Sequence, residues 1–90
     1  MKLQVFEVEK FIEQARPPVA VSRRVRYHGT MPVEHYVVLT ARWKEDPNVV
    51  VYYEEFVAGC ALEDEVKRKL KERSEALIRR LEEAKVPWLK

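Results

Sequence analysis

Three stretches in the middle of the chain predict strands: the first two alternate in the period expected of strands with one buried face, and the third is rich in β-branched and aromatic residues. They cover residues 19–28, 33–43 and 49–57. The segments between them, residues 29–32 and 46–48, contain glycine, proline, aspartate and asparagine, which favour turns. Because both connections are short, the simplest pairing is a three-stranded antiparallel meander.

The segments before and after these strands have apolar residues at the spacing of a helix. Over residues 62–85, leucine and valine recur four or seven positions apart on one side of a helix, and acidic residues occupy the first turn, where the helix dipole favours anions. A shorter helix is predicted over residues 7–16, ended by Pro17. Residues 2–6 also fit a short strand, so a fourth, N-terminal strand stays open as an alternative.

Together these elements predict an α+β fold in which both helices cover one face of the sheet. The length of 90 residues suits one domain, so residues 1–90 are expected to fold as a single unit. Apolar residues make up 47% of the chain, enough to form a core between the sheet and the helices. The apolar tail at residues 86–89 is expected to dock in a groove of its own domain or of a partner.

The register of the two hairpins decides which side chains share the uncovered face of the sheet. We take Val25 opposite Val37 and Trp43 opposite Val49, which places a consistent apolar set under the helices. A shift by one residue in either hairpin would mix the two faces. The even-numbered positions then share the uncovered face, and the candidate binding residues among them are Arg24, Arg26, His28, Tyr36, Arg42, Tyr52 and Phe56. Glu54 lies among them and opposes an anionic ligand.

Charge is unevenly distributed, although 17 basic and 15 acidic residues leave a net charge of only +2. Residues 16–44 carry six basic residues and one acidic residue, residues 45–66 carry seven acidic residues and none that is basic, and residues 67–90 carry nine basic and four acidic residues. The first two strands are therefore the most basic part of the expected sheet, which is typical of proteins with a polyanionic partner. The same charges also suit a solvated edge strand.

The leading functional hypothesis is non-catalytic binding of single-stranded nucleic acid, DNA more readily than RNA. Bases would stack on Tyr36, Tyr52 and Phe56. The arginines at positions 24, 26 and 42 would neutralise phosphates.

The alternative hypothesis is a homodimeric structural or protein-interaction module that uses the same face as its interface. A large exposed apolar surface on a small protein marks an interaction site. In this interpretation the arginines pair with the acidic residues 45–66 of a neighbouring copy. A homodimer is expected in either case.

The predicted order of a helix, three strands and a helix is shared by the double-stranded-RNA-binding domains. In that family a glycine-rich segment precedes a lysine-rich start of the last helix. The corresponding segment here, residues 59–65, reads GCALEDE, which is acidic and would repel a phosphate backbone. The function of that family is therefore not expected.

No residues form a recognisable catalytic or metal-binding pattern. Cys60 is the only cysteine, and its acidic neighbours oppose thiolate formation. His28 and His35 flank the first turn without a third ligand, and the adjacent Glu54 and Glu55 point to opposite faces of a strand. We therefore expect a protein that is not an enzyme and that holds no cofactor and no metal.

Composition bears on the source and the compartment. Glutamate, lysine and arginine are abundant, while the chain has one asparagine and two glutamines, a pattern typical of thermophilic, archaeal-type proteins. No apolar run approaches the ~20 residues needed to cross a membrane, and early charged residues interrupt any signal peptide. We expect a cytoplasmic location without membrane contact.

Overall fold

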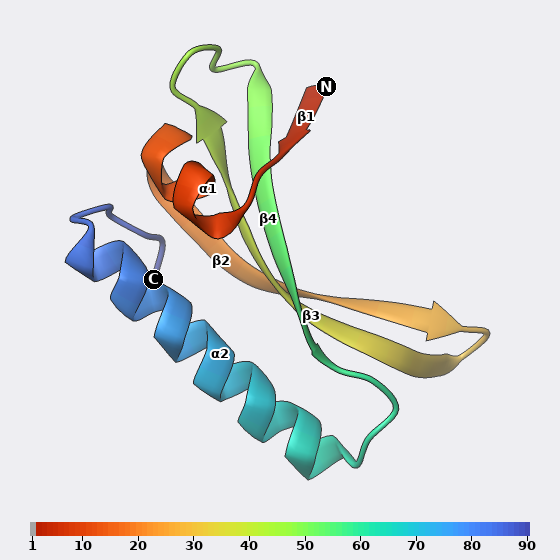
Figure 1. Cartoon of the computed structure of the whole chain (residues 1–90). Coiled ribbons are helices and arrows are strands. Elements are labelled where there is room, and N and C mark those ends of the chain that lie inside the picture. The colour runs from red at the N-terminus through yellow and green to blue at the C-terminus, as the bar shows by residue number, and fades with distance from the viewer. Residues whose placement is uncertain (1) are drawn as a thin grey trace.

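The computed structural model describes residues 2–90 and shows one four-stranded sheet with two helices (Figure 1). The elements follow the chain in the order β1 (Lys2–Val5), α1 (Val8–Gln14), β2 (Ala15–His28), β3 (Met31–Trp43), β4 (Val49–Ala58) and α2 (Glu63–Glu83). Across the sheet the strands lie in the order β1-β4-β3-β2, with β1 parallel to β4 and the other neighbours antiparallel. The predicted α+β fold is confirmed, and the N-terminal strand that the sequence left open is present.

Both helices pack against the same face of the sheet (Figure 1). Leu70, Leu77 and Leu81 lie at helical spacing on one side of α2 and are buried. Phe11 of α1 joins them, and the helix-facing side chains of the strands complete the core, among them Val19, Val37, Leu39 and Val51. No polar or charged residue between positions 2 and 90 is fully buried, so apolar contacts hold the layers together.

The first helix is shorter than predicted. It ends before Ala15, where β2 begins four residues earlier than expected. The strand passes through Pro17 and Pro18, which are joined by a cis peptide bond. Prolines are tolerated here because β2 is an edge strand and its pairing with β3 is irregular between Arg16 and Ala20. The remaining bounds agree with the prediction to within two residues.

The register of the β2–β3 hairpin also differs from the expected one. Val25 lies opposite His35, and Val37 lies opposite Arg23, a shift of two residues. The turn is tighter than predicted, since residue 28 pairs with residue 31, and an irregularity between Arg26 and Tyr27 then takes up one extra residue of β3, which leaves a shift of two. A shift by two keeps each side chain on its expected face, because side chains alternate with period two. The β3–β4 register is the expected one.

The apolar tail after α2 docks on its own domain. Lys85 adopts a left-handed conformation with a φ of 58°, and the chain then turns back towards β2. The Val19 amide donates to the Pro87 carbonyl oxygen at 3.0 Å, and the Leu89 amide donates to the Val19 carbonyl oxygen at 2.8 Å. Between these two bonds, Trp88 packs against the core.

A polar cluster ties α2 to β4 on the helix-facing side of the sheet. The Arg73 guanidinium donates to Glu55 Oε1 at 2.9 Å, and the Tyr53 hydroxyl donates to the same oxygen at 2.9 Å. The hydrogen bond from Arg73 holds the pKa of Glu55 below its usual range, so the carboxylate stays charged. Burial, and then the hydrogen bond to Glu55, raises the pKa of Tyr53 to about 12.

We expect the Tyr53 phenol to ionise near pH 12 in the folded protein, against about 10 in the unfolded chain. Because the folded state holds this proton more tightly, Tyr53 contributes its full stabilisation below pH 10 and loses it as the pH rises from 10 through 12. Ultraviolet absorbance titration of the wild type and of Tyr53→Phe checks this. The wild type should show an ionisation step near pH 12 that the variant lacks. If the step that the variant lacks lies near pH 10 instead, the assignment to Tyr53 is wrong.

Candidate binding surface on the open face of the sheet

The open face is the surface of the sheet that neither helix covers. Strand alternation brings to it the even-numbered residues of β2, of β3 from Glu34 onwards and of β4 up to Phe56, which include all seven predicted binding residues. Leu3 and Val5 of β1 join this face because they pair with even-numbered residues of β4. Glu34 joins it opposite Arg26. The open face is therefore wider, and carries one more carboxylate, than the sequence led us to expect.

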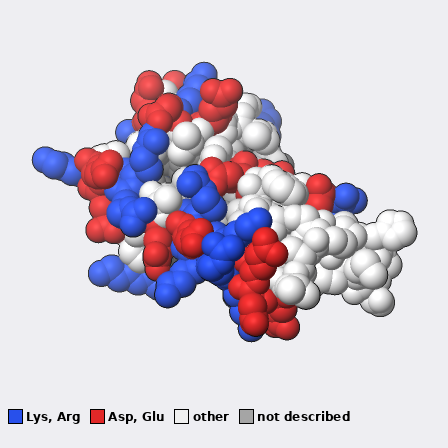
Figure 2. All heavy atoms as spheres, turned by 60° about the horizontal axis from the view of Figure 1, so that its bottom comes forward, with Lys and Arg blue, Asp and Glu red and all other residues white. Residues whose placement is uncertain are grey.

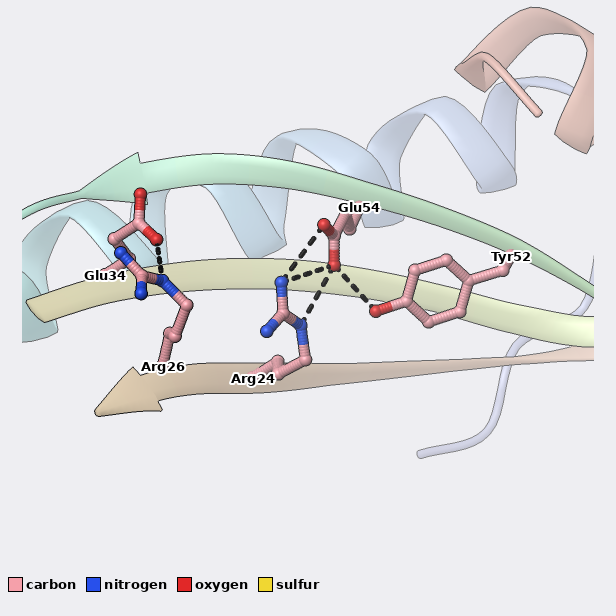
Figure 3. A network of polar contacts seen from close by, with 5 residues as sticks. All are labelled: Arg24, Arg26, Glu34, Tyr52 and Glu54. Atoms are coloured by element: carbon pink, nitrogen blue, oxygen red, sulfur yellow. Dashed lines mark hydrogen bonds and ion pairs between the residues drawn. The ribbon is translucent and has the colours of Figure 1, made fainter. Parts of the chain in front are cut away.

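Arg24 reaches across β3 to a carboxylate on β4 (Figure 3). Its Nε donates to Glu54 Oε2 at 3.0 Å and its Nη2 donates to Glu54 Oε1 at 3.1 Å, which makes a bidentate pair. The Tyr52 hydroxyl donates to Glu54 Oε2 at 2.7 Å. The hydrogen bond to Glu54 raises the pKa of the Arg24 guanidinium. Two side chains of the same chain thus engage Glu54.

Arg26 forms a second ion pair on the open face. Its Nε donates to the carboxylate of Glu34, its cross-strand neighbour (Figure 3). This hydrogen bond lowers the pKa of Glu34 below its usual range, so the carboxylate stays charged. Two of the three arginines predicted to contact phosphate are therefore already paired with carboxylates.

The three aromatic side chains predicted to stack on bases differ in their exposure to solvent. The Arg24 guanidinium lies 4.3 Å from the centroid of the Tyr36 ring and covers one face of it. Phe56 packs edge-on against Tyr36, with 5.8 Å between the ring centroids, and its residue remains 55% exposed. Tyr52 is partly buried, and its hydroxyl is bonded to Glu54. Phe56 is therefore the most accessible of the three rings.

Arg42 and His28 lie apart from these pairs. The Arg42 guanidinium donates to the Pro47 carbonyl oxygen at 3.2 Å, near the β3–β4 turn. His28 is exposed at the end of the β2–β3 hairpin, opposite Met31. The structure thus places the seven predicted residues on one face but does not gather their charges into one uncompensated cluster.

Apolar side chains, together with Ser22 and Thr40, make up much of the rest of the open face. Leu3 is 56% exposed and Val5 is 66% exposed, beside the first half of β4. Along β4, the ion pair at Glu54 separates this group from Phe56. Val38, the cross-strand neighbour of Glu54, is buried on this face and outside the main core. The open face thus combines apolar side chains with arginines whose carboxylate partners come from the same chain.

The residues considered for catalysis or metal binding do not come together. His28 lies opposite Met31, whereas His35 lies opposite Val25, so the two histidines do not meet. Cys60 is exposed in the segment before α2. Within residues 2–90, no group of three histidine, cysteine, aspartate or glutamate side chains could hold a metal ion. In that same range no helix is both long and apolar enough to cross a membrane.

Sequence reasoning missed three members of the open face. Leu3 and Val5 were not assigned to it because residues 2–6 left the existence of a strand open, although the alternation in the sequence KLQV was the available signal. Glu34 stands at an even position of the second predicted strand, opposite in sign to Arg26, which could have marked it as a partner.

Comparison with known proteins adds no further assignment to this surface. No model of a protein family matches the chain, and no curated protein or solved structure shows significant similarity to it.

Proposed function

We propose that the protein is a homodimeric protein-interaction module in which the open face joins two copies of the chain. The observation that carries this proposal is the make-up of the face: exposed apolar side chains lie on both sides of an arginine–glutamate pair that is formed within the chain. Exposed apolar surface on a small protein is typical of an interaction site. A two-fold axis would bring the same surface of each copy together.

The ion pairs suit burial in such an interface. A charge pair taken out of water stabilises a structure only when its geometry is good and its remaining hydrogen-bonding groups are engaged. The Arg24–Glu54 pair is bidentate, receives a third hydrogen bond from Tyr52 and stacks on Tyr36. Its desolvation therefore costs less than that of two isolated charges.

The size of the face also suits a dimer. The molecule measures 40 × 29 × 20 Å along its principal axes. A standard interface needs about 800 Å² from each partner. One face of the sheet offers an area of that order, and two sheets can pack face to face at about 10 Å.

Binding of a single strand to the same face has less support. A phosphate that approached Arg24 would meet the carboxylate of Glu54, and one that approached Arg26 would meet Glu34. A base stacking on Tyr36 would compete with the guanidinium that lies over the ring. A polyanion on the open face would thus meet two carboxylates as well as three arginines.

We expect the wild type to dimerise in a salt-insensitive way, and Val5→Glu to weaken the dimer at least about a hundredfold, because the new carboxylate would be buried without a partner. Sedimentation or light scattering over a range of concentrations, at low salt and at about 1 M salt, checks this, since 1 M salt screens exposed charges within about 3 Å. Val5 is 66% exposed in the single chain, so the variant should fold.

Leu62→Glu is the matched control, because Leu62 is 79% exposed at the start of α2 and lies off the open face. It should remain a dimer. A wild type that stays monomeric at high concentration would overturn the proposal, as would a dimer that Val5→Glu and Leu3→Glu leave intact.

A further inference from the structure

A groove runs between the edge strand β2 and α2, on the side of the sheet opposite the open face. It consists of two hollows of about 460 and 430 Å³. The two share Arg23, Lys67 and Leu70 in their walls, so they form one continuous feature. It extends from the β2–β3 hairpin, whose tip projects past α2 in Figure 1, to the C-terminal tail at Trp88.

Apolar side chains from both layers form the floor of the groove. Val21 and Val25 contribute from β2, and Val66, Leu70 and Ile78 contribute from α2. The helix does not close over this edge of the sheet, because the hairpin diverges from it (Figure 1). Apolar surface that would belong to the core in a more tightly covered sheet is left accessible here.

Basic side chains stand along the walls of the groove. Arg23 extends from β2, and Lys67 and Lys71 extend from α2. Lys67 pairs at 3.2 Å with Glu63, whose side chain is the one carboxylate among the residues that line the two hollows, and such exposed pairs contribute little to stability. None of the ion pairs among residues 2–90 involves Arg23 or Lys71. This arrangement contrasts with Arg24 and Arg26, the neighbours of Arg23 on the same strand.

Aromatic rings border the groove at its two ends. Tyr27 and His35 line the hollow beneath the hairpin, and Trp88 lines the hollow at the tail. Tyr27 is 57% exposed, so its ring is accessible to a ligand. Figure 2 shows both signs of charge mixed over much of the face it presents, whereas the part that projects to the right, where Figure 1 places the hairpin tip, shows no charged side chains in this view.

We propose that this groove binds single-stranded nucleic acid. Basic walls that track a phosphate backbone, together with accessible rings on which bases stack, are the two features that non-specific single-strand binding requires. Arg23 and Lys71 neutralise phosphates, and Tyr27 stacks on a base. This site uses residues that the open face does not contain, so it goes beyond dimerisation and does not depend on it.

The chemistry of the groove favours a single strand over other anions. The bases of a duplex are stacked inside it and cannot reach an apolar floor, whereas the bases of a single strand can. A purely ionic ligand such as heparin would use the basic walls alone and gain nothing from Tyr27. Preference for a single strand over both is therefore the expected signature.

The test is an anisotropy titration with a labelled oligo(dT) of about 20 nucleotides, long enough for site sizes of about 4–16. The double variant Arg23→Ala/Lys71→Ala should bind roughly tenfold more weakly at low salt and should reduce the slope of log K against log salt by about 1.4, or 0.7 for each lost phosphate contact. Tyr27→Ala should weaken binding about 5- to 150-fold, with the salt slope unchanged.

Arg16→Ala/Arg68→Ala is the matched control, since it removes one charge from β2 and one from α2, both outside the groove. It should bind like the wild type. Equal loss in both double variants, or equal affinity of the wild type for oligo(dT), duplex DNA and heparin, would overturn the proposal, as would no binding of oligo(dT) at low salt. The oligomeric state is measured separately, so failure of this site and failure of the dimer are distinguishable.

Discussion

Replacement of Phe11 with alanine is expected to lower the free energy of unfolding by about 3–5 kcal/mol, as measured by urea denaturation. Phe11 is fully buried and is the only buried residue of α1. A helix of seven residues is too short to be stable without tertiary contacts. The loss therefore combines a cavity in the core with the detachment of α1 from the sheet.

Phe56→Ala serves as the control for this prediction, because Phe56 is a phenylalanine of the same domain that lies on the open face and is 55% exposed. Its removal should cost about 1 kcal/mol, mainly the edge-on contact with Tyr36. Similar losses in the two variants would show that α1 is not anchored by Phe11.

Leu39→Ala should lower the free energy of unfolding by about 2–5 kcal/mol. Leu39 is fully buried on β3, where strands lie on both sides of it and the helices cover its side chain. The surrounding side chains come from several elements and cannot all move to fill the space, so a cavity remains. Calorimetry and denaturant unfolding both measure the loss.

The matched control for Leu39 is Leu62→Ala, since Leu62 is 79% exposed and outside the core. This change should alter the free energy of unfolding by no more than about 0.5 kcal/mol. A loss at Leu39 as small as that at Leu62 would be incompatible with the packing of the two helices on one face of the sheet.

The hydrophobic pattern predicted the strands and the long helix well, because periodicity over ten or more residues reports directly on which face is buried. It placed the end of the first helix two residues too late, because tertiary pairing of β2 overrode the local signal there. Pro17 and Pro18 end helices, but an edge strand also accommodates them, and β2 extends through both. Local sequence does not say whether a strand will lie at an edge.

The predicted residues lie on the open face although the register expected for the β2–β3 hairpin was wrong. The β2–β3 pairing is shifted by two residues, and only an odd shift would have exchanged the faces. The side-chain contacts on the open face were harder to predict from the sequence. Arg24 and Glu54 are 30 residues apart on strands that are not neighbours, so their pairing depends on how the side chains cross β3.

The groove was not predicted because it depends on the angle between the hairpin and α2, and local sequence patterns do not determine such an angle. One residue did carry a signal. Arg23 stands at an odd position of the first predicted strand, among valines that face the helices. A charged side chain at such a position indicates that this part of the sheet is open to solvent.

The pairing of the tail with Val19 has a consequence for the outer edge of β2. An unpaired edge strand is a template on which further chains can add, and long edges are therefore sites of aggregation. Here the tail uses both backbone groups of Val19, and the neighbouring Pro17 and Pro18 have no amide hydrogen to offer a newcomer. The tail and the two prolines thus protect the part of this edge at residues 17–19 from pairing with a further strand.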